Sequence, residues 1–358
     1  MIKVFVTFSQ DVYYPGQLIQ GRVIIEVKKK ETIRGIDLYF NGVANVRWKE
    51  TKTLEIKQFT KSTNYFSKHI SLLKGNQTLS TGRNVYPFQY QLPGGIPSSF
   101  QGQYGGVQYR LKCVVDSPFK QVKIIADKKI SVIHDLDLNS EPQARESPLL
   151  EKQLTLSGGL YRTPGRIKVA FKLNQCGYVP GESIPIHATV QNESSKTLKG
   201  SSVCLKQVVK YHAENKTKVA CEVITKLSRG RIKPGGEEVW EGESLMVPQV
   251  PVSRLPACSF IEIFYVITFI VDVGFLNSCV ELSKDILIGS VPLRIGDGQR
   301  EYDQHGHPSG TNDGILQSKP GKLEKSPTTL SRPVTPPPSY DEVVLSEKHT
   351  LNKSCPDN

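Results

Sequence analysis

Few residues of this chain have the types and spacing that catalysis requires. An enzyme needs a nucleophile beside a base, a pair of carboxylates in a cleft, a metal cluster or a cradle for phosphate. The sequence contains none of the motifs GxSxG, GxxxxGK(S/T) and HExxH, and no GxGxxG follows a predicted strand. We therefore expect a protein that is not an enzyme, with no catalytic residues and no cofactor.

Metal-binding and redox patterns are equally weak. Of the seven histidines, only His305 and His307 lie close together, in a polar stretch that predicts no ligand site. Asp135 and Asp137 resemble a carboxylate pair, but their polar, proline-flanked surroundings favour a solvated connection between domains. The seven cysteines include no CxxC pair and are odd in number, which predicts reduced, mostly buried thiols with neither a zinc site nor a disulfide framework.

One short motif does have a recognisable binding chemistry. Pro337, Pro338 and Tyr340 form a PPxY sequence in a proline-rich stretch. Prolines hold the backbone in polyproline II at little entropic cost, so their rings can enter the aromatic groove of a WW domain while the tyrosine fills a neighbouring pocket. We predict that these three residues bind a WW domain.

Two other functions compete for the same residues. The stretch 340–343 also fits a tyrosine-based sorting signal, because a bulky apolar residue, Val343, occupies its fourth position. Thr335 and Ser326 each precede a proline and could be phosphorylated by proline-directed kinases. A plain linker is the third alternative.

The elements that must present this motif repeat along the chain. Tyr14-Pro15-Gly16-Gln17 returns 165 positions later as Val179-Pro180-Gly181-Glu182, and the strand pattern after Arg34-Gly35 returns at the same distance after Lys199-Gly200. Further on, 109–116 matches 265–272 with the distance shortened to 156. We attribute the shortening to a slip of about ten residues in a loop, and we infer that one scaffold is duplicated.

Period-two alternation predicts that the scaffold is all-β. Residues 166–173 alternate strictly, and Pro-Gly and Gly-Gly pairs separate further short strands. No segment has a long helical stripe, so each copy is predicted to be an antiparallel, immunoglobulin-like β-sandwich. We predict an N-domain at 1–134, an interdomain linker at 135–148, a C-domain at 149–296 and a disordered tail at 297–358 that carries the PPxY motif.

The most apolar run could be mistaken for a membrane span. Residues 259–274 contain Glu262 and Asp272, are too short to cross a bilayer, and match the more polar stretch 104–116 in the first copy. Both are predicted to be core strands. Met1 leads directly into an alternating strand rather than a secretory signal, so a cytoplasmic location is expected.

The net charge of +12 is concentrated in the predicted folded part, where 39 Lys and Arg face 25 Asp and Glu. Such a surface can attract acidic peptides, phosphorylated tails or anionic lipid headgroups. The basic residues are not interleaved with the exposed aromatic pattern of an RNA-binding sheet, so nucleic acid is not an expected partner.

Taken together, these features resemble the α-arrestins, also called arrestin domain-containing proteins. The resemblance rests on 14–27, 109–116, 288–292 and the PPxY motif, and most specifically on 177–192. It implies two tandem arrestin domains. It also implies a non-enzymatic adaptor that binds a membrane receptor or transporter as cargo and recruits a HECT-type ubiquitin ligase through WW domains, for ubiquitination, endocytosis and endosomal sorting.

The resemblance further implies peripheral association with the plasma membrane and endosomes. Many animal members have two PPxY motifs and this chain has one, which weakens the expectation of bivalent binding to tandem WW domains. Cys221 and Cys258 do not match the thioredoxin-binding pattern of one family branch. The alternative function is a structural subunit of an arrestin-fold sorting or coat complex, in which the tail is incidental.

Overall fold

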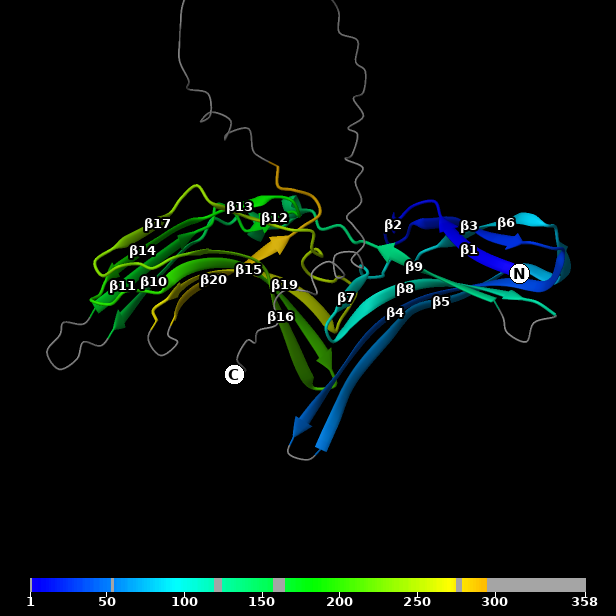
Figure 1. Ribbon diagram of the computed structural model, residues 1–358, viewed down its shortest axis with the longest axis horizontal. Coiled ribbons are helices and arrows are strands. Elements are labelled where there is room, and N and C mark those ends of the chain that lie inside the picture. The colour runs from blue at the N-terminus through cyan, green and yellow to red at the C-terminus, as the bar shows by residue number, and fades with distance from the viewer. Residues whose placement is uncertain (1, 53–54, 119–123, 157–164, 275–278, 295–358) are drawn as a thin grey trace, which may run out of the picture. The chain divides into compact units, whose positions relative to one another are not determined.

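Each half of the protein folds into a β-sandwich, as the alternating sequence predicts (Figure 1). The computed structural model describes the chain except for residues 1, 53–54, 119–123, 157–164, 275–278 and 295–358. Within the described residues, the only helices are two short 3-10 helices, η1 (Leu138–Ser140) and η2 (Pro142–Arg145). The predicted all-β fold class is confirmed.

The N-domain contains a three-stranded and a six-stranded sheet. The smaller sheet has the order β1-β3-β6, formed by β1 (Ile2–Phe8), β3 (Leu18–Val27) and β6 (Gly82–Gln91). The larger has the order β2-β9-β8-β4-β5, with β7 paired to β8: β2 (Val12–Tyr13), β4 (Glu31–Lys52), β5 (Glu55–Leu79), β7 (Phe100–Gly102), β8 (Gly105–Asp116) and β9 (Ile124–Val132). Its pairs are antiparallel except for the short parallel pair β2–β9.

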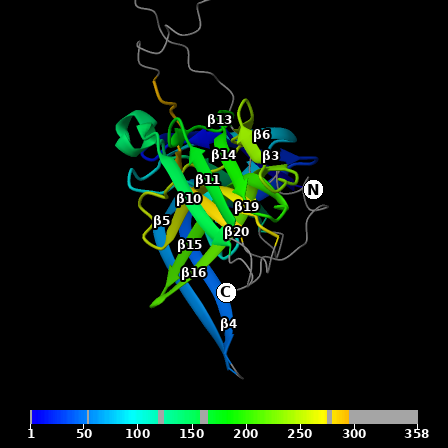
Figure 2. The same ribbon diagram turned by 90° about the vertical axis from the view of Figure 1, so that its left-hand side faces the viewer.

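The C-domain repeats this plan with a four-stranded and a five-stranded sheet (Figure 2). The first has the order β10-β11-β14-β17: β10 (Leu149–Leu156), β11 (Gly165–Lys172), β14 (His187–Glu193) and β17 (Glu237–Trp240). The second has the order β12-β20-β19-β15-β16: β12 (Gly177–Tyr178), β15 (Gly200–Ala213), β16 (Lys216–Arg229), β19 (Ile261–Asp272) and β20 (Cys279–Ile288). A separate ribbon pairs β13 (Ser183–Pro185) with β18 (Ser244–Met246).

Alternation places one face of each strand in the core. On β11, Ile167, Val169 and Phe171 are buried, and on β4 the same holds for Ile36, Leu38 and Phe40. The apolar run at 259–274 forms β19, whose inward residues are fully buried, so its prediction as a core strand is confirmed. Its counterpart β8 lies at the equivalent place in the N-domain sheet.

The duplication extends to single hydrogen bonds in the Pro-Gly turns. The backbone N–H of Gln17 donates to the carbonyl of Tyr14, and that of Glu182 donates to the carbonyl of Val179, both at 3.0 Å. In each turn the same Gln or Glu side chain accepts a bond back from the backbone N–H of Tyr14 or Val179, at 2.9 Å. The shared glycine has a positive φ, 77° at Gly16 and 92° at Gly181, which explains why glycine occupies both copies.

The shortened repeat distance has a different origin from the predicted loop slip. Gly35 packs against the carbonyl of Leu73, and Gly200 packs against the carbonyl of Arg229. Gly35 and Gly200 are 165 positions apart, whereas Leu73 and Arg229 are 156 positions apart. The distance therefore shortens within the hairpin, because the N-domain hairpin is longer. Figures 1 and 2 show the β4–β5 hairpin extending well beyond the neighbouring strands of its sheet. The extra residues lengthen paired strands, so the prediction of a loop insertion was wrong.

The stretch 184–190, which lies 165 positions after 19–25 of β3, is divided between two strands. Pro185 ends β13, which pairs with β18, whereas β14 begins at His187 and pairs with β11. Proline lacks the N–H that a continuous ladder would need. The chain therefore changes pairing partner at this point, whereas the equivalent β3 is continuous.

Candidate functional site

The predicted WW-binding residues Pro337, Pro338 and Tyr340 lie outside the described residues, and so do His305 and His307. The PPxY assignment therefore stays a prediction from sequence. Within the described part of the chain, no group of three or more His, Cys, Asp and Glu residues could hold a metal ion. The candidate functional surfaces of that part are the junction between the two sandwiches and the faces of their sheets.

The long β4–β5 hairpin contacts the C-domain along one side of β5. The hydroxyl of Tyr65 donates a hydrogen bond to the carbonyl of Ala257 at 3.0 Å. Lys61 Nζ lies 5.3 Å from the ring centre of Phe260, which permits a cation–π interaction. Closer to the hairpin tip, Lys57 Nζ lies 3.6 Å from the carboxylate of Glu214 in an exposed ion pair. The hairpin therefore connects the domains as well as completing its own sheet.

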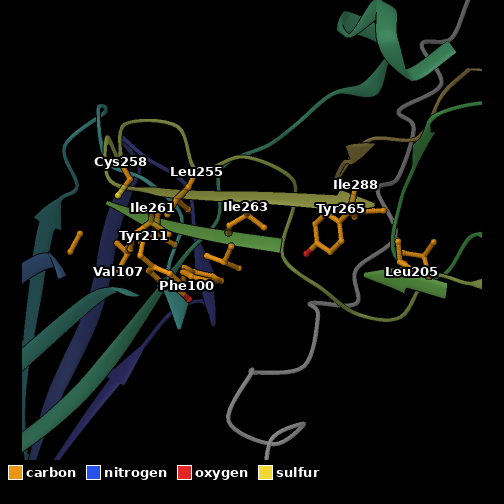
Figure 3. Close-up of a cluster of buried hydrophobic side chains, with 14 of the residues drawn as sticks. Phe100, Val107, Leu205, Tyr211, Leu255, Cys258, Ile261, Ile263, Tyr265 and Ile288 are labelled. Atoms are coloured by element: carbon orange, nitrogen blue, oxygen red, sulfur yellow. The ribbon is translucent and has the colours of Figure 1, made fainter. Parts of the chain in front are cut away.

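A second contact joins Tyr211 of β15 to the segment that follows β7. The rings of Tyr211 and Tyr104 meet edge to face with centres 5.6 Å apart. The hydroxyl of Tyr211 lies against Gly102, where a Cβ would overlap it. Figure 3 shows Tyr211 beside Phe100 and Val107, with residues of both domains in one buried cluster. Apolar burial thus continues across the junction.

The C-domain loop that meets Tyr65 has unusual backbone geometry. Arg254 and Ala257 both have positive φ, 67° and 64°, in the left-handed region that residues with a Cβ seldom occupy. The Arg254 guanidinium compensates by binding both carboxylate oxygens of Glu141, at 2.7 and 2.9 Å. Bidentate geometry is the strongest form of an Arg–carboxylate pair. The loop is therefore held by the N-domain on one side and by the linker on the other.

The linker is packed on the C-domain, in contrast to the solvated connection that its composition predicts. Leu138 and Ala144 are fully buried, and Lys284 Nζ binds the carboxylate of Glu146 at 2.8 Å. Asp137 accepts a hydrogen bond from the backbone N–H of Asn139 at the start of η1, as an N-cap. The hydroxyl of Ser290 donates to Asp135 at 3.1 Å. Both aspartates therefore have structural partners, and the linker is docked through Leu138 and Ala144 while Asp135 stays exposed, so it is less fully solvated than its composition predicts.

Burial keeps the thiols and phenols of the core in their neutral forms. Burial, with a smaller contribution from Asp37, raises the pKa of Cys113 to about 12. Burial raises the pKa of Tyr65 as well, and a hydrogen bond with Cys258 adds to the effect. A reactive cysteine needs the opposite shift. Four of the six described cysteines are buried, as predicted, whereas Cys221 and Cys279 are exposed.

Sequence reasoning missed the junction residues because they have no periodic signature. Tyr65 and Tyr211 lie on opposite domains, 146 positions apart, and each looks like an ordinary strand residue. Ala257 gives no warning of positive φ, since glycine is the residue that usually marks it. Glycine at position 102 was the one visible hint of a close approach.

Comparison with known proteins agrees with this architecture. Residues 2–139 match the family model "Arrestin (or S-antigen), N-terminal domain", and residues 163–293 match "Arrestin (or S-antigen), C-terminal domain". Arrestin domain-containing protein 17 of Caenorhabditis elegans is 28% identical over 300 residues, which cover 79% of this chain and 68% of the relative. Arrestin domain-containing protein 4 of Homo sapiens is 27% identical over 351 residues, covering 94% and 79%.

For a third relative, the alignment covers a smaller share of the relative's length. Arrestin domain-containing protein 1 of Homo sapiens is 27% identical over 270 residues, covering 74% of this chain and 59% of the relative. Among the described residues, no helix is long and apolar enough to span a lipid bilayer. The two matched arrestin domains, the duplicated turns and these relatives lead to one conclusion: the chain belongs to the α-arrestin family of arrestin domain-containing proteins.

Proposed function

We propose that this arrestin-family adaptor links a membrane receptor or transporter to a WW-domain HECT-type ubiquitin ligase. The observation that carries the proposal is a PPxY motif, Pro337 to Tyr340, that follows two arrestin domains in the same chain. The domains bind cargo, and the motif recruits the ligase. Ubiquitination then directs the cargo to endocytosis and endosomal sorting.

The physical chemistry of the motif supports the ligase half of the proposal. Proline favours polyproline II before any partner binds, so we expect a run such as Pro336, Pro337 and Pro338 to lose little entropy on binding. The motif belongs to neither arrestin domain, since the second family model ends at residue 293. A single motif gives monovalent binding, without the gain in effective concentration that a second linked site would add.

The charge of the arrestin domains supports the cargo half. The basic excess favours acidic segments of cargo and anionic lipid headgroups at a membrane surface. Peripheral association of a cytoplasmic protein with the plasma membrane and endosomes follows from such contacts. Their salt dependence is a direct check, because screening shortens the range of electrostatic attraction.

A pull-down with isolated WW domains tests the ligase half. The wild type should be retained, and Tyr340→Ala should lose most of the binding because the tyrosine pocket stays empty. Tyr302→Ala, another tyrosine of the same tail, is the matched control and should bind like the wild type. Equal retention of wild type and Tyr340→Ala would sink the proposal.

The alternative of a structural coat subunit predicts a different result. Such a subunit would co-fractionate stoichiometrically with fixed partners even after residues 297–358 are deleted. The adaptor should instead lose the ligase on deletion while keeping its cargo. Proximity labelling of wild type against Tyr340→Ala would identify the ligase and the cargo together.

A further inference from the structure

A pocket at one end of the three-stranded N-domain sheet gathers positive charge. It has a volume of about 310 Å³ and is lined by Lys3, Glu26, Val27, Lys28, Gly82 and Arg83. Three of these side chains are cations and one is a carboxylate. Among the described residues, the cationic side chains have neither an ion-pair nor a hydrogen-bond partner. The pocket therefore has an excess of unpaired positive charge.

The duplicated C-domain sheet shows that this charge is particular to the N-domain. β1 and β3 correspond to β11 and β14, 165 positions later, and β6 pairs with β3 as β17 pairs with β14. The charged residues of the pocket are Lys3, Glu26, Lys28 and Arg83, and the C-domain positions in the same order hold Lys168, Gln191, Glu193 and Glu237. Two carboxylates of the C-domain are thus replaced by cations.

In the C-domain these carboxylates bind their neighbours. Glu193 forms an ion pair with Lys168 and lies 3.9 Å from Arg166 Nε. Glu237 accepts a hydrogen bond from the side chain of Gln191 at 3.1 Å. The N-domain has a cation at each of the two equivalent positions, and like charges at neighbouring strand positions destabilise a sheet. An anionic ligand would supply the negative charge that Glu193 and Glu237 supply in the other copy.

An apolar row lies beside the cations on the same outer face of the sheet. Phe5 of β1 lies opposite Ile24 of β3, which lies opposite Val85 of β6. Phe5 and Val85 are each 46% exposed, and the C-domain equivalent of Phe5 is the smaller Ala170. Two residues along a strand span about 7 Å, so this row adjoins the cations. A lipid interface offers phosphate and apolar groups side by side, which matches this arrangement.

A phosphorylated peptide suits this face less well than a lipid headgroup. β3 is paired with β1 on one side and β6 on the other, so its backbone groups are already bonded. Peptides that bind a sheet by strand addition need a free edge, which the face does not provide. Lys29 and Lys30 follow Lys28 and are exposed, so they add to the attraction toward an anionic surface.

We propose that this pocket binds the phosphate groups of a phosphoinositide headgroup, with Phe5 entering the membrane interface. Lys3, Lys28 and Arg83 contact the phosphates. The proposal rests on the proposed adaptor function, whose peripheral membrane association it assigns to one end of the N-domain sheet. The volume of the pocket is at the lower end of the range for ligand sites, about 300–1,000 Å³, which suits a single headgroup.

Vesicle sedimentation with the full-length protein tests the ligand class. The probe is a phosphatidylcholine vesicle that contains phosphatidylinositol bisphosphate. The control vesicle contains phosphatidylserine at the same surface charge. The wild type should bind the phosphoinositide vesicle several-fold more tightly, because its phosphate monoesters enter the pocket. Equal binding to both vesicles would overturn the pocket and leave charge-driven membrane association in place.

A variant that copies the C-domain locates the contact. Lys28→Glu introduces the carboxylate that Glu193 provides in the other copy, and it should weaken phosphoinositide binding by roughly ten-fold or more. Thermal unfolding should show no loss of stability, because the introduced carboxylate can pair with Lys3. Lys233→Glu, in an exposed loop of the C-domain, is the control with the same change in net charge, and it should bind like the wild type. Equal weakening by both variants would contradict the site.

Two further measurements separate the lipid from other phosphate ligands. Phe5→Ala should weaken vesicle binding and leave the binding of soluble inositol trisphosphate unchanged, as measured by calorimetry. Unchanged vesicle binding by Phe5→Ala would overturn the membrane contact. A phosphoserine peptide that binds more tightly than the headgroup, and is lost in Lys28→Glu, would make the pocket a peptide site instead.

The adaptor function is tested separately from the pocket. Lys28→Glu should still bind isolated WW domains through Tyr340, because the pocket and the motif are distinct. Failure of WW binding in the wild type would remove the ligase half of the proposed function, whereas failure of phosphoinositide selectivity would remove only the pocket.

Discussion

At the scale of single residues, Gly102 and Tyr211 make a close contact between the two arrestin domains. The Tyr211 side chain is fully buried, although it reaches from β15 into the N-domain segment beside Tyr104. A side chain at position 102 would overlap the hydroxyl and the ring of Phe100. Glycine is required here by close approach rather than by backbone conformation, because its φ is not in the left-handed region.

Gly102→Ala is therefore expected to destabilise the protein by about 1–3 kcal/mol, the usual cost of overpacking. Tyr211→Phe removes the hydroxyl, so the cost of the Gly102→Ala substitution should be smaller in that background. Gly95→Ala is the control, because a Cβ there meets nothing within 4 Å. Urea denaturation gives the free energy of unfolding of the wild type and of each of these variants. Equal stability of the alanine variants at 102 and 95 would contradict the close contact.

The two environments of cysteine lead to a second prediction. At pH 8, iodoacetamide should modify exposed Cys221 in the folded protein and leave Cys113 unmodified, because burial raises the pKa of Cys113 to about 12. The raised folded-state pKa has a sign for stability. The protonated Cys113 thiol contributes fully to the free energy of unfolding below the thiol pKa of the unfolded chain, about 8.5. This contribution is lost as the pH rises toward the folded-state pKa of about 12. Mass spectrometry reads the labelling, and rapid native labelling of Cys113 would contradict its burial.

At the scale of elements, the loop between β18 and β19 stores backbone strain that its ion pair offsets. Arg254 has a φ of 67° and binds Glu141 of the linker with both carboxylate oxygens. Residues with a Cβ lose about 1–2 kcal/mol in this region relative to ordinary backbone. The pair thus fastens the linker to the loop that also contacts Tyr65.

Arg254→Gly should be more stable than Arg254→Ala by up to about 1 kcal/mol, since both lose the ion pair and only glycine relieves the strain. This reverses the usual order, in which glycine is the worse residue. Lys152 on β10 is the matched control, because it is an exposed strand residue without positive φ, and there Gly should be less stable than Ala. Thermal and urea unfolding provide the comparison. If the alanine variant were more stable than the glycine variant at position 254 as well as at position 152, the backbone at Arg254 would not be strained.

Sequence patterns predicted the elements well because local rules control them. Alternation identified β11 and β19, and the Pro-Gly pairs identified the turns at Gly16 and Gly181. The longer β4–β5 hairpin was missed because added strand residues and an added loop shift the repeat distance equally. The docking of Leu138 and the contact of Tyr65 depend on which surfaces meet after folding, and no local period encodes that.

At the scale of the whole described molecule, the two domains share one buried core, so we expect them to unfold together. Buried residues from both belong to a single core cluster, and the chain from Met1 to Leu293 forms one unit by its internal contacts. Tyr65 and Tyr104 supply the N-domain side of the described junction. Interfaces between domains of one chain are often weak enough for the domains to unfold separately, so this continuity has a measurable consequence.

Calorimetry should show one unfolding transition for the wild type, with calorimetric and van't Hoff enthalpies in agreement. Tyr65→Ala combined with Tyr104→Ala should divide it into two transitions, because the hydrogen bond to Ala257 and the ring contact with Tyr211 are both removed. Tyr39→Ala is the control, since Tyr39 is 41% exposed and stacks only on His69 among the described ring contacts. Two transitions in the wild type itself would show that the junction does not couple the domains. Two transitions in the double variant and one in the wild type would show that these two tyrosines couple the domains. The cooperative unfolding of the duplicated sandwiches would then depend on contacts between the domains, which neither copy can make within itself.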